Sequence, residues 1–430
     1  MKRILSLLFV SAMLLALVPA YGATFSDVDK SLWCYNEITT LTEEKVISGY
    51  ADGTFRPSES VTYGAALKLV LLAAGSGVKT PTTSGSPFSG YYVYARSKGY
   101  ADEVKNLSAP ATRLFVARLV ARTLRVPRSE ASSPYFDAND GYATGLYYTG
   151  IMQGSNDSSG HRLLKPSKSI TRGEMAAVVW RIGHAKWRGT YAKNTGYILC
   201  SGKTYAINRS LPVSRIDTEQ IGTKDGFLSY PGASLGVDIS SHQGTIDWNK
   251  VAGAGVKFAI VRVGYRGYGA EGTMNEDTRY LENIEGAKAA GLTVGVYFFS
   301  QAITTEEARE EADFILERIA GLGIDGPVVF DWERVSSANG RAKNLGKSAL
   351  TACAAAFTQA VRNAGYEPYI YFDQTVGYSG IDLTQFGDCG WWLAEYNSSP
   401  NFYYNYQMWQ YTDSGRVPGI SGKTDLDLWF

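Results

Sequence analysis

The sequence predicts an α/β protein, with a barrel of strands and helices from about residue 234 to the end and a mainly α-helical repeat region before it. In the second half, short apolar strands alternate with helical segments, which favours a mostly parallel sheet closed into a barrel. In the first half, a pattern of about 50 residues recurs three times, which indicates helical units that share one core. A length of 430 residues fits two or three such domains.

The composition excludes several classes of protein. Apolar residues make up 45% of the chain and charged residues 19%, so the protein can bury real cores and is not disordered. A formal charge of +1 gives no general attraction to nucleic acid or to acidic membranes. Aromatic residues reach 13%, which fits stacking on sugar rings and fits ordinary cores equally well.

The first 22 residues have the pattern of a secretory signal. Lys2 and Arg3 supply a positive start, residues 4–17 form an apolar run too short to span a bilayer comfortably, and small residues follow. We therefore expect a signal peptide over 1–22, a mature protein that begins near Ala23, and no membrane span after cleavage.

The cysteines and histidines give no metal signature. Cys34, Cys200, Cys353 and Cys389 are too few for a disulfide scaffold. Cys353 and Cys389 could pair, and free, partly buried thiols are the alternative. With three histidines and no ligand spacing, the sequence argues against a zinc site.

The repeat region divides into units at 23–80, 86–128 and 133–184. The first and third units share an opening Phe-Ser-Asp or Phe-Asp, a glycine-bounded turn and a Thr-initiated apolar helix. The segments are, in the first unit, Phe25–Val28, Gly49–Phe55 and Ser60–Thr62, and in the third, Phe136–Asp137, Gly150–Gly154 and Ser169–Glu174. The middle unit keeps mainly Thr112-Arg113 and the helix after it.

These motifs resemble S-layer homology (SLH) domains, three of which form a helical bundle that holds a pyruvylated secondary cell-wall polysaccharide. The resemblance implies polymer binding by Asp27, Arg113, Asp137 and Arg172, because an arginine fork grips a carboxylate with two bonds. The first unit departs from the pattern with Tyr63-Gly64, and the second, which we class as degenerate, lacks the Asp-Gly turn. A bundle that serves only as a spacer is the alternative interpretation.

A polar, Gly- and Ser-rich segment over 185–233 separates the two halves. Tyr197–Leu199 and Thr204–Ile207 flank Ser201–Lys203, a pattern that predicts a β-hairpin with a tight turn. We interpret this segment as a linker or small β module without assigned chemistry.

The barrel elements follow from residue 234. The expected strands are Leu235–Ile239, Phe258–Val263, Thr293–Phe299, Pro327–Asp331, Tyr369–Phe372, Trp391–Ala394 and Tyr406–Gln410. The expected helices between them include Asp277–Ala290, Thr305–Ile319 and Ser348–Ala364. In such barrels the reactive groups sit at the carboxyl ends of the strands.

The segment Val328-Val329-Phe330-Asp331-Trp332-Glu333 carries the clearest chemical signal. Strand side chains alternate faces, so Asp331 and Glu333 point the same way and Trp332 points opposite. Two close carboxylates raise the proton affinity of one of them, and glycosidic cleavage needs one protonated and one ionised carboxyl. An acidic cap or a solvated strand end is the alternative for so short a motif.

Other motifs extend this signal over the whole second half. They are Gly236–Ser240, Ser241-His242-Gln243-Gly244, Phe258–Tyr265, Ala289–Phe298, Trp392–Tyr396, Trp409–Tyr411 and Asp425-Leu426-Asp427. Together they resemble glycoside hydrolase family 25, the Chalaropsis-type lysozymes, over 234–430. The resemblance implies a modified, TIM-like β/α barrel that cleaves the β-1,4 bond between N-acetylmuramic acid and N-acetylglucosamine, without metal or organic cofactor.

The resemblance also implies roles for individual acids. Glu333 corresponds to the proton donor, and Asp331 to the partner that steadies the oxocarbenium-like centre or orients the substrate's own N-acetyl group. Asp238 corresponds to the acid of the first strand. Asp425 best matches the acid of the closing motif. Asp427 lies where many relatives have Asn, so the resemblance does not decide which of the two acids faces the cleft.

Substrate binding is expected from Tyr297, Trp392, Tyr396, Trp409 and Arg262, which match positions of the sugar groove. Core packing is the alternative for the aromatic residues. His242, in the His-Gln-Gly turn, is expected to have a structural role.

The sequence as a whole therefore predicts a secreted lysozyme anchored to the bacterial cell wall by its SLH repeats. Its expected partners are peptidoglycan glycan strands as substrate and a secondary cell-wall polysaccharide, with no nucleic acid. The alternative is a non-catalytic wall-binding or surface-layer protein with an inactive barrel.

Overall fold

The computed structural model describes residues 25–78, 86–184, 186–335 and 340–430. It consists of two compact units, 1–207 and 208–430, and each is described by itself. The division falls inside the segment 185–233, so the first part of that segment belongs to one unit and the rest to the other. The expected signal peptide, 1–22, lies outside the described residues. None of the described helices is both long enough and apolar enough to cross a membrane.

The first unit contains mainly helices. They are α1 (Tyr35–Glu43), α2 (Tyr63–Ala73), α3 (Ser89–Ser97), α4 (Arg113–Thr123), α5 (Gly141–Tyr148), α6 (Arg172–Gly183) and α7 (Lys186–Thr195). Two short hairpins accompany them, β1 (Ser155–Asn156) with β2 (Arg162–Leu163) and β3 (Tyr197–Cys200) with β4 (Lys203–Ala206). The hairpin predicted around Ser201–Lys203 is confirmed.

Three helices of this unit begin in the same way. Thr62, Thr112 and Thr171 cap α2, α4 and α6, and each side chain accepts a hydrogen bond from the backbone three residues later. Such caps satisfy donors that a helix start leaves free. The segments before these helices also pair with one another in turn, through isolated bridges between Ser60 and Thr171, Thr62 and Pro110, and Thr112 and Ser169. The three repeats thus meet at one centre, over a continuous apolar core.

The second unit is built on one large sheet. Its strands are β7 (Ser234–Ile239), β8 (Phe258–Arg266), β9 (Met274–Glu276), β10 (Thr293–Ser300), β11 (Val328–Trp332), β12 (Pro368–Asp373), β13 (Gly390–Ala394), β14 (Met408–Gly415) and β15 (Thr424–Trp429). A separate hairpin, β5 (Gly222–Lys224) with β6 (Phe227–Ser229), precedes them.

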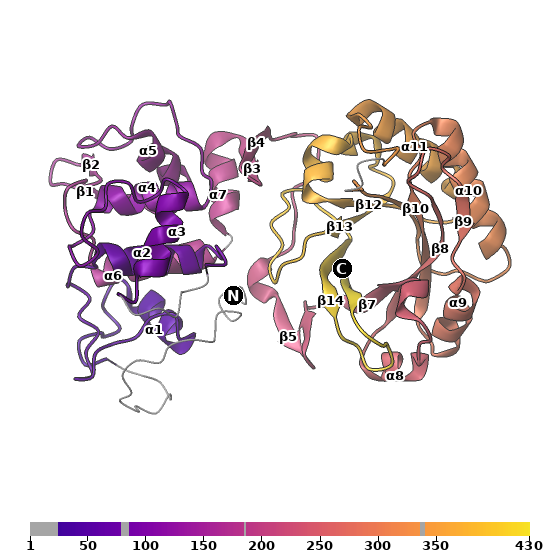
Figure 1. Cartoon of the computed structure of the whole chain (residues 1–430), viewed down its shortest axis with the longest axis horizontal. Helices are drawn as coiled ribbons and strands as arrows, with labels where there is room; N and C mark the ends of the chain where they lie inside the picture. The colour runs from indigo at the N-terminus through magenta and orange to yellow at the C-terminus, as the bar shows by residue number, and fades with distance from the viewer. Residues whose placement is uncertain (1–24, 79–85, 185, 336–339) are drawn as a thin grey trace. The chain divides into compact units, whose positions relative to one another are not determined.

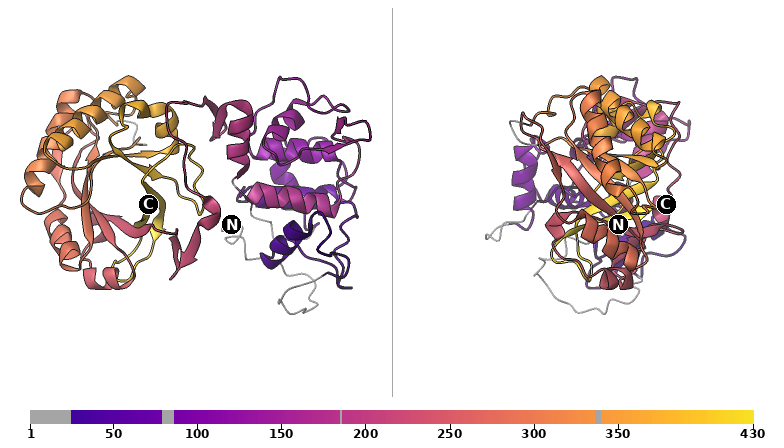
Figure 2. Two further views of the ribbon diagram at one scale, coloured as in Figure 1. Left: turned by 180° about the vertical axis from the view of Figure 1, so that it is seen from behind. Right: turned by 90° about the vertical axis from the view of Figure 1, so that its right-hand side faces the viewer.

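Eight of these strands close into a barrel. The order runs β10-β11-β12-β13-β14-β15-β7-β8, and pairing of β8 with β10 completes the ring, while β9 extends β8 on the outside. The seven expected strands are all present. Strand β15, which was not expected, pairs antiparallel with both β14 and β7 and fills the last place in the ring. The ring is visible in Figure 1 and, from behind, in Figure 2.

Helices surround much of this ring. The helices α8 (Trp248–Gly253), α9 (Tyr280–Ala289), α10 (Thr305–Ile319) and α11 (Lys347–Asn363) lie outside the strands (Figure 1). In α10, Ala308, Ala312, Ile315 and Ile319 are buried and recur every three or four residues, so one stripe of the helix faces the sheet.

Side-chain alternation along β11 determines which of its residues face the barrel interior. Val329 belongs to an interior cluster that also includes Phe258 and Ile260. Phe330 points outward and packs on Phe357 of α11, with ring centroids 5.3 Å apart. The alternation therefore turns Asp331, at the carboxyl end of the strand, toward the interior.

The four cysteines, Cys34, Cys200, Cys353 and Cys389, are buried, and Cys34, Cys353 and Cys389 are free thiols. The pairing of Cys353 with Cys389, one of two alternatives, does not occur.

Candidate active site

An open pocket lies where the barrel strands end. The residues that line it come from β7, β8, β10, β11, β12, β13, β14 and β15 and from the turns after them. They are Asp238, Ile239, Ser240, His242, Gln243, Arg262, Tyr297, Phe299, Asp331, Glu333, Tyr371, Trp392, Tyr396, Gln410 and Asp425. The four acids expected in the site, Glu333, Asp331, Asp238 and Asp425, are thus brought together at one place.

Asp331 and Glu333 differ in exposure. Asp331 is buried, at 5% exposed, and among the described residues its Oδ1 has no hydrogen-bond partner. Glu333 follows the last residue of β11 and is exposed at the pocket mouth. Burial, followed by the charges of Glu333 and Asp238, raises the pKa of Asp331 well above its usual range. Lost hydration against the pocket walls, followed by the charges of Asp373 and Asp425, raises the pKa of Glu333.

Asp238 reaches the pocket from β7 and is held by the side chain of Gln410. The amide Nε2 of Gln410 donates to Oδ2 of Asp238 at 2.8 Å. The amide oxygen of Gln410 accepts hydrogen bonds from the hydroxyls of Tyr371, at 2.7 Å, and Tyr396, at 2.9 Å. Burial and the charge of Asp425 raise the pKa of Asp238 well above its usual range, while the hydrogen bond from Gln410 opposes that shift.

The closing motif places its two acids differently. Asp425 pairs with Asp238 across the β15–β7 ladder and lines the pocket, and burial raises its pKa to about 6. Asp427 is fully buried, does not line the pocket, and accepts a 2.9 Å hydrogen bond from Trp392 Nε1 through its Oδ1. Burial, followed by the charges of Asp238 and Asp425, raises its pKa well above the usual range.

The charges of this pocket are almost all negative. Arg262 is the basic residue of its lining, and its guanidinium is held by Asp277, with Nη2 2.8 Å and Nε 2.9 Å from Oδ2. Arg262 lowers the pKa of Asp331, but burial and the neighbouring acids outweigh it. Carboxyls that close together cannot all ionise at neutral pH, so the pocket retains protons.

The aromatic residues separate into two groups. Tyr297, Trp392 and Tyr396 line the pocket, and Tyr396 is 51% exposed. Trp409, expected in the groove, is fully buried and outside the lining, and its indole donates to the carbonyl of Glu395 at 2.9 Å. Strand alternation explains the correction, because Met408 belongs to the interior cluster and its neighbour Trp409 therefore points the other way.

The sequence did not assign five polar or aromatic lining residues to the site: Ser240, Gln243, Phe299, Tyr371 and Gln410. The same alternation would have found Gln410, since it lies two residues after the interior Met408 in β14. His242 also lines the pocket, in the short 3-10 turn Ser241–Gln243 that Ser240 caps through its side chain. The side chain of Gln243 returns to the backbone N–H of Ser240 at 2.8 Å, which fixes this turn.

Comparison with known families identifies the domains. Residues 237–420 match the model of glycosyl hydrolases family 25, and residues 24–67 and 137–176 match the S-layer homology domain. The chain carries a family 25 glycosyl hydrolase domain and S-layer homology repeats. The four pocket acids all lie in or just beyond the matched part of the family 25 domain.

The curated relatives that are similar to part of this chain include two named lysozymes. The chain is 32% identical over 195 residues to the autolytic lysozyme of Clostridium acetobutylicum, a match that covers 45% of this chain and 54% of the relative. It is 25% identical over 200 residues to Lysozyme M1 of Streptomyces globisporus, covering 44% of this chain and 65% of the relative. The chain thus spans about half the length of the first of these relatives.

Two solved structures are also similar. The modular autolysin LytC of Streptococcus pneumoniae, in complex with a synthetic peptidoglycan ligand, is 24% identical with a TM-score of 0.41, covering 55% of this chain and 52% of that chain. A bacterial lysozyme from Streptomyces coelicolor is 23% identical with a TM-score of 0.39, covering 46% of this chain and 91% of that chain.

In the SLH repeats, the two expected acids have equivalent contacts. Asp27 accepts hydrogen bonds from the backbone N–H groups of Phe55 and Arg56, at 2.8 and 2.7 Å. Asp137 accepts from Leu164 and Lys165, both at 2.8 Å. Each acid therefore fixes the turn of its own repeat.

The two expected arginines are equivalent in one contact and differ in another. Nε of Arg113 donates to the carbonyl of Leu164, and Nε of Arg172 donates to the carbonyl of Phe55, both at 2.7 Å. Arg113 is buried and forms an ion pair with Glu174 at 2.5 Å. Arg172 is only partly buried and its second hydrogen bond goes to the carbonyl of Ser48, so neither bond uses a carboxylate.

Proposed function

We propose that the family 25 domain hydrolyses the β-1,4 bond between N-acetylmuramic acid and N-acetylglucosamine in peptidoglycan, with Glu333 as proton donor. One observation carries the proposal. Glu333 and three further carboxyls converge on one open pocket, and the pKa of each is raised. A glycosidase needs a carboxyl that keeps its proton near neutral pH next to one that can lose it.

The exposure of the two central acids supports their assignment. The charge of Glu333 is one cause of the raised pKa of Asp331, so ionisation of Glu333 favours a proton on Asp331. Glu333 is exposed at the pocket mouth and can pass a proton to a leaving glycosidic oxygen. Asp331 is buried beneath it, with Oδ1 free among the described residues to steady positive charge on the sugar or to orient the substrate's N-acetyl group.

The pocket walls fit a sugar chain. Tyr396 is half exposed, and the bond from its hydroxyl to Gln410 fixes the ring in place. Tyr297 also lines the pocket and is partly buried, whereas Trp392 lines it with only 2% of its surface exposed. Flat rings with fixed polar edges suit stacking against sugar faces. We propose these three residues, with Arg262, as substrate-binding residues.

We further propose that the protein is secreted and held at the bacterial cell surface by its SLH repeats, which bind a secondary cell-wall polysaccharide. The partial exposure of Arg172 and its lack of a carboxylate partner among the described residues support a role in gripping an acidic polymer. Arg113, already paired with Glu174, is better suited to holding repeats together.

The proposed activity is tested by incubating the purified protein with peptidoglycan and measuring new reducing ends. We expect steady release by the wild type and a loss of several orders of magnitude in Glu333→Gln, which keeps the shape but has no transferable proton. Wall binding without any release would support the alternative, a non-catalytic wall protein. Release by Glu333→Gln at the wild-type rate would place the acid elsewhere.

A further inference from the structure

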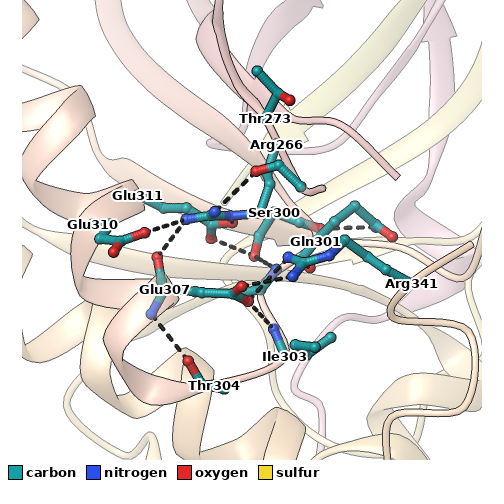
Figure 3. A network of polar contacts seen from close by, with 12 residues as sticks. Arg266, Thr273, Ser300, Gln301, Ile303, Thr304, Glu307, Glu310, Glu311 and Arg341 are labelled. Carbon is teal, nitrogen blue, oxygen red and sulfur yellow. Dashed lines mark hydrogen bonds and ion pairs between the residues drawn. The ribbon is translucent and has the colours of Figure 1, made fainter. Parts of the chain in front are cut away.

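A polar network connects the ends of two barrel strands to the first half of α10 (Figure 3). At the end of β8, Nε of Arg266 lies 2.7 Å from Oε1 of the fully buried Glu311, and Nη2 lies 3.1 Å from Glu310. At the end of β10, the hydroxyl of Ser300 donates to the other oxygen of Glu311 at 2.5 Å. Both strand ends are thereby tied to one helix.

A second arginine joins this network from the connection between β11 and α11. Arg341 binds Glu307 with two parallel bonds, Nη2 to Oε1 at 2.6 Å and Nη1 to Oε2 at 3.0 Å. Nη1 also donates to the backbone carbonyl of Gln301 at 3.1 Å, and the backbone N–H of Arg341 donates to the carbonyl of Tyr268 at 2.9 Å. The side chain of Arg341 is 8% exposed. A buried two-bond pair of this kind fixes direction as well as distance.

Gln301 connects this network to the backbone of the proposed proton donor, Glu333. Gln301 is fully buried, and its Nε2 donates to the carbonyl of Ser300 at 2.9 Å and to the carbonyl of Glu333 at 3.2 Å. The β10–β11 ladder ends at the pair Ser300–Trp332. Glu333 therefore lies one residue past the last ladder pair with β10, and Gln301 supplies a contact to its backbone there.

We propose that Gln301 and Arg341 are positioning residues that hold the backbone of Glu333 at the angle its carboxyl needs to reach a glycosidic oxygen. Glu307 fixes Arg341, Arg341 fixes Gln301, and Gln301 holds the carbonyl of Glu333. Arg341 also fastens the chain that follows Glu333 to the connection after β8. This inference rests on the proposed function, because it assigns a purpose to the orientation of Glu333. A misplacement of about 1 Å at a reacting group can cost on the order of 100-fold in rate.

The test compares Arg341→Met and Gln301→Met with the wild type on soluble, labelled glycan strands. Each change keeps side-chain length and removes the hydrogen bonds. We expect kcat to fall about 10- to 100-fold while KM stays within about threefold, because the substrate walls are untouched. Arg341→Lys keeps the charge but not the planar fork, and should recover only part of kcat. Its matched control is Arg318→Met, which breaks a 2.7 Å pair between α10 and Glu276 of β9 outside the pocket lining and should keep the wild-type kcat.

Two further measurements distinguish a loss of Glu333 positioning from a loss of stability, and from a failure of the proposed function. Hydrogen exchange of the peptide that contains 328–335 should rise in Arg341→Met and Gln301→Met but not in Arg318→Met, whether or not the protein cuts peptidoglycan. Melting temperatures show how much of each variant is folded. The inference is overturned if kcat per folded molecule matches the wild type, or if exchange around Glu333 is unchanged in both variants. An inactive wild type would instead refute the proposed function. The exchange result would still show whether Gln301 and Arg341 hold the backbone of Glu333.

Discussion

The side-chain amide of Gln410 donates a 2.8 Å hydrogen bond to Oδ2 of Asp238, while its oxygen accepts from Tyr371 and Tyr396. One buried amide thus connects an acid of β7 to the aromatic wall of the pocket. Since an amide presents its donor and acceptor at fixed ends, this arrangement sets the orientation of Asp238 and of both tyrosines at once.

Replacement of Gln410 should therefore impair the pocket as a whole. In Gln410→Leu, Asp238 loses the donor that favours its charged form, and its pKa should rise further. We expect the rate of reducing-end release to fall about 10- to 100-fold. The control is Gln359→Leu on the exposed face of α11, where the amide bonds only to nearby helix residues. Equal rates in the two variants would show that the bond from Gln410 to Asp238 has no role.

Asp427 should behave as a neutral acid. Its Oδ1 accepts from Trp392, its Oδ2 has no donor among the described residues, and the carboxyl of Asp238 is its polar neighbour. A proton on Asp427 that points to Asp238 satisfies both groups. Asparagine offers the same acceptor and donor, so Asp427→Asn should keep most of the activity, whereas Asp427→Leu should lose it.

The pH dependence of the free energy of unfolding should differ between Asp427→Asn and the wild type. A carboxyl whose folded pKa is raised contributes stability that is complete below its unfolded pKa, near 3.8, and is lost as the pH rises through the folded pKa. Asparagine cannot ionise, so the variant should gain stability relative to the wild type as the pH rises from 4.5 to 8. Urea unfolding at both pH values measures the difference. A difference that does not change with pH would mean that Asp427 is already ionised.

Asp373 should tune the pH range of activity. Its charge is the second cause, after lost hydration, of the raised pKa of Glu333. A proton donor must be protonated, so activity should fall as the pH rises through the pKa of Glu333. Asp373→Asn removes the charge but can still accept the 2.7 Å bond from the backbone of Val376. We expect the alkaline limb of kcat/KM to move to lower pH, and an unmoved limb would exclude Asp373 as a cause.

The two arginines of the SLH repeats should separate binding from folding. Arg172→Ala should weaken retention of the full chain on purified cell walls and lower the melting temperature less than Arg113→Ala does, because Arg172 is only partly buried and its loss leaves no carboxylate without a partner. Arg113→Ala removes a buried arginine that pairs with Glu174, whose side chain is 25% exposed, and should cost about 1–3 kcal/mol of stability. Sedimentation with walls and thermal unfolding measure the two effects. Unchanged retention of Arg172→Ala would refute its role in binding.

Much of the barrel could be predicted because its strands are short apolar runs between clear helices. Helix Thr305–Ile319 was predicted at its observed bounds, since Thr304 caps it and its apolar residues recur at helical spacing. Strand β15 was missed because Asp425 and Asp427 interrupt its apolar residues. Those same acids are tolerated there because one faces the pocket and the other accepts from Trp392.

The acids of the site could be placed from the sequence, while their supports could not. Asp331 lies near the end of the buried strand β11 and Glu333 directly follows that strand, so strand periodicity predicts that both turn to one side. Gln410 and Gln301 act across 172 and 32 residues of sequence, so only the closed barrel brings them to Asp238 and Glu333. Trp409 was expected in the groove from the family resemblance, whereas alternation within β14 turns it to the opposite face.

The central claim is that the acids around Glu333 cut the glycan at muramic acid. The most direct measurement is mass analysis of wild-type digests after borohydride reduction, which labels the sugar at each new reducing end. The account predicts reduced N-acetylmuramic acid in the wild-type digest and none in Glu333→Gln. Reduced N-acetylglucosamine, or release of stem peptides with intact glycan, would contradict it.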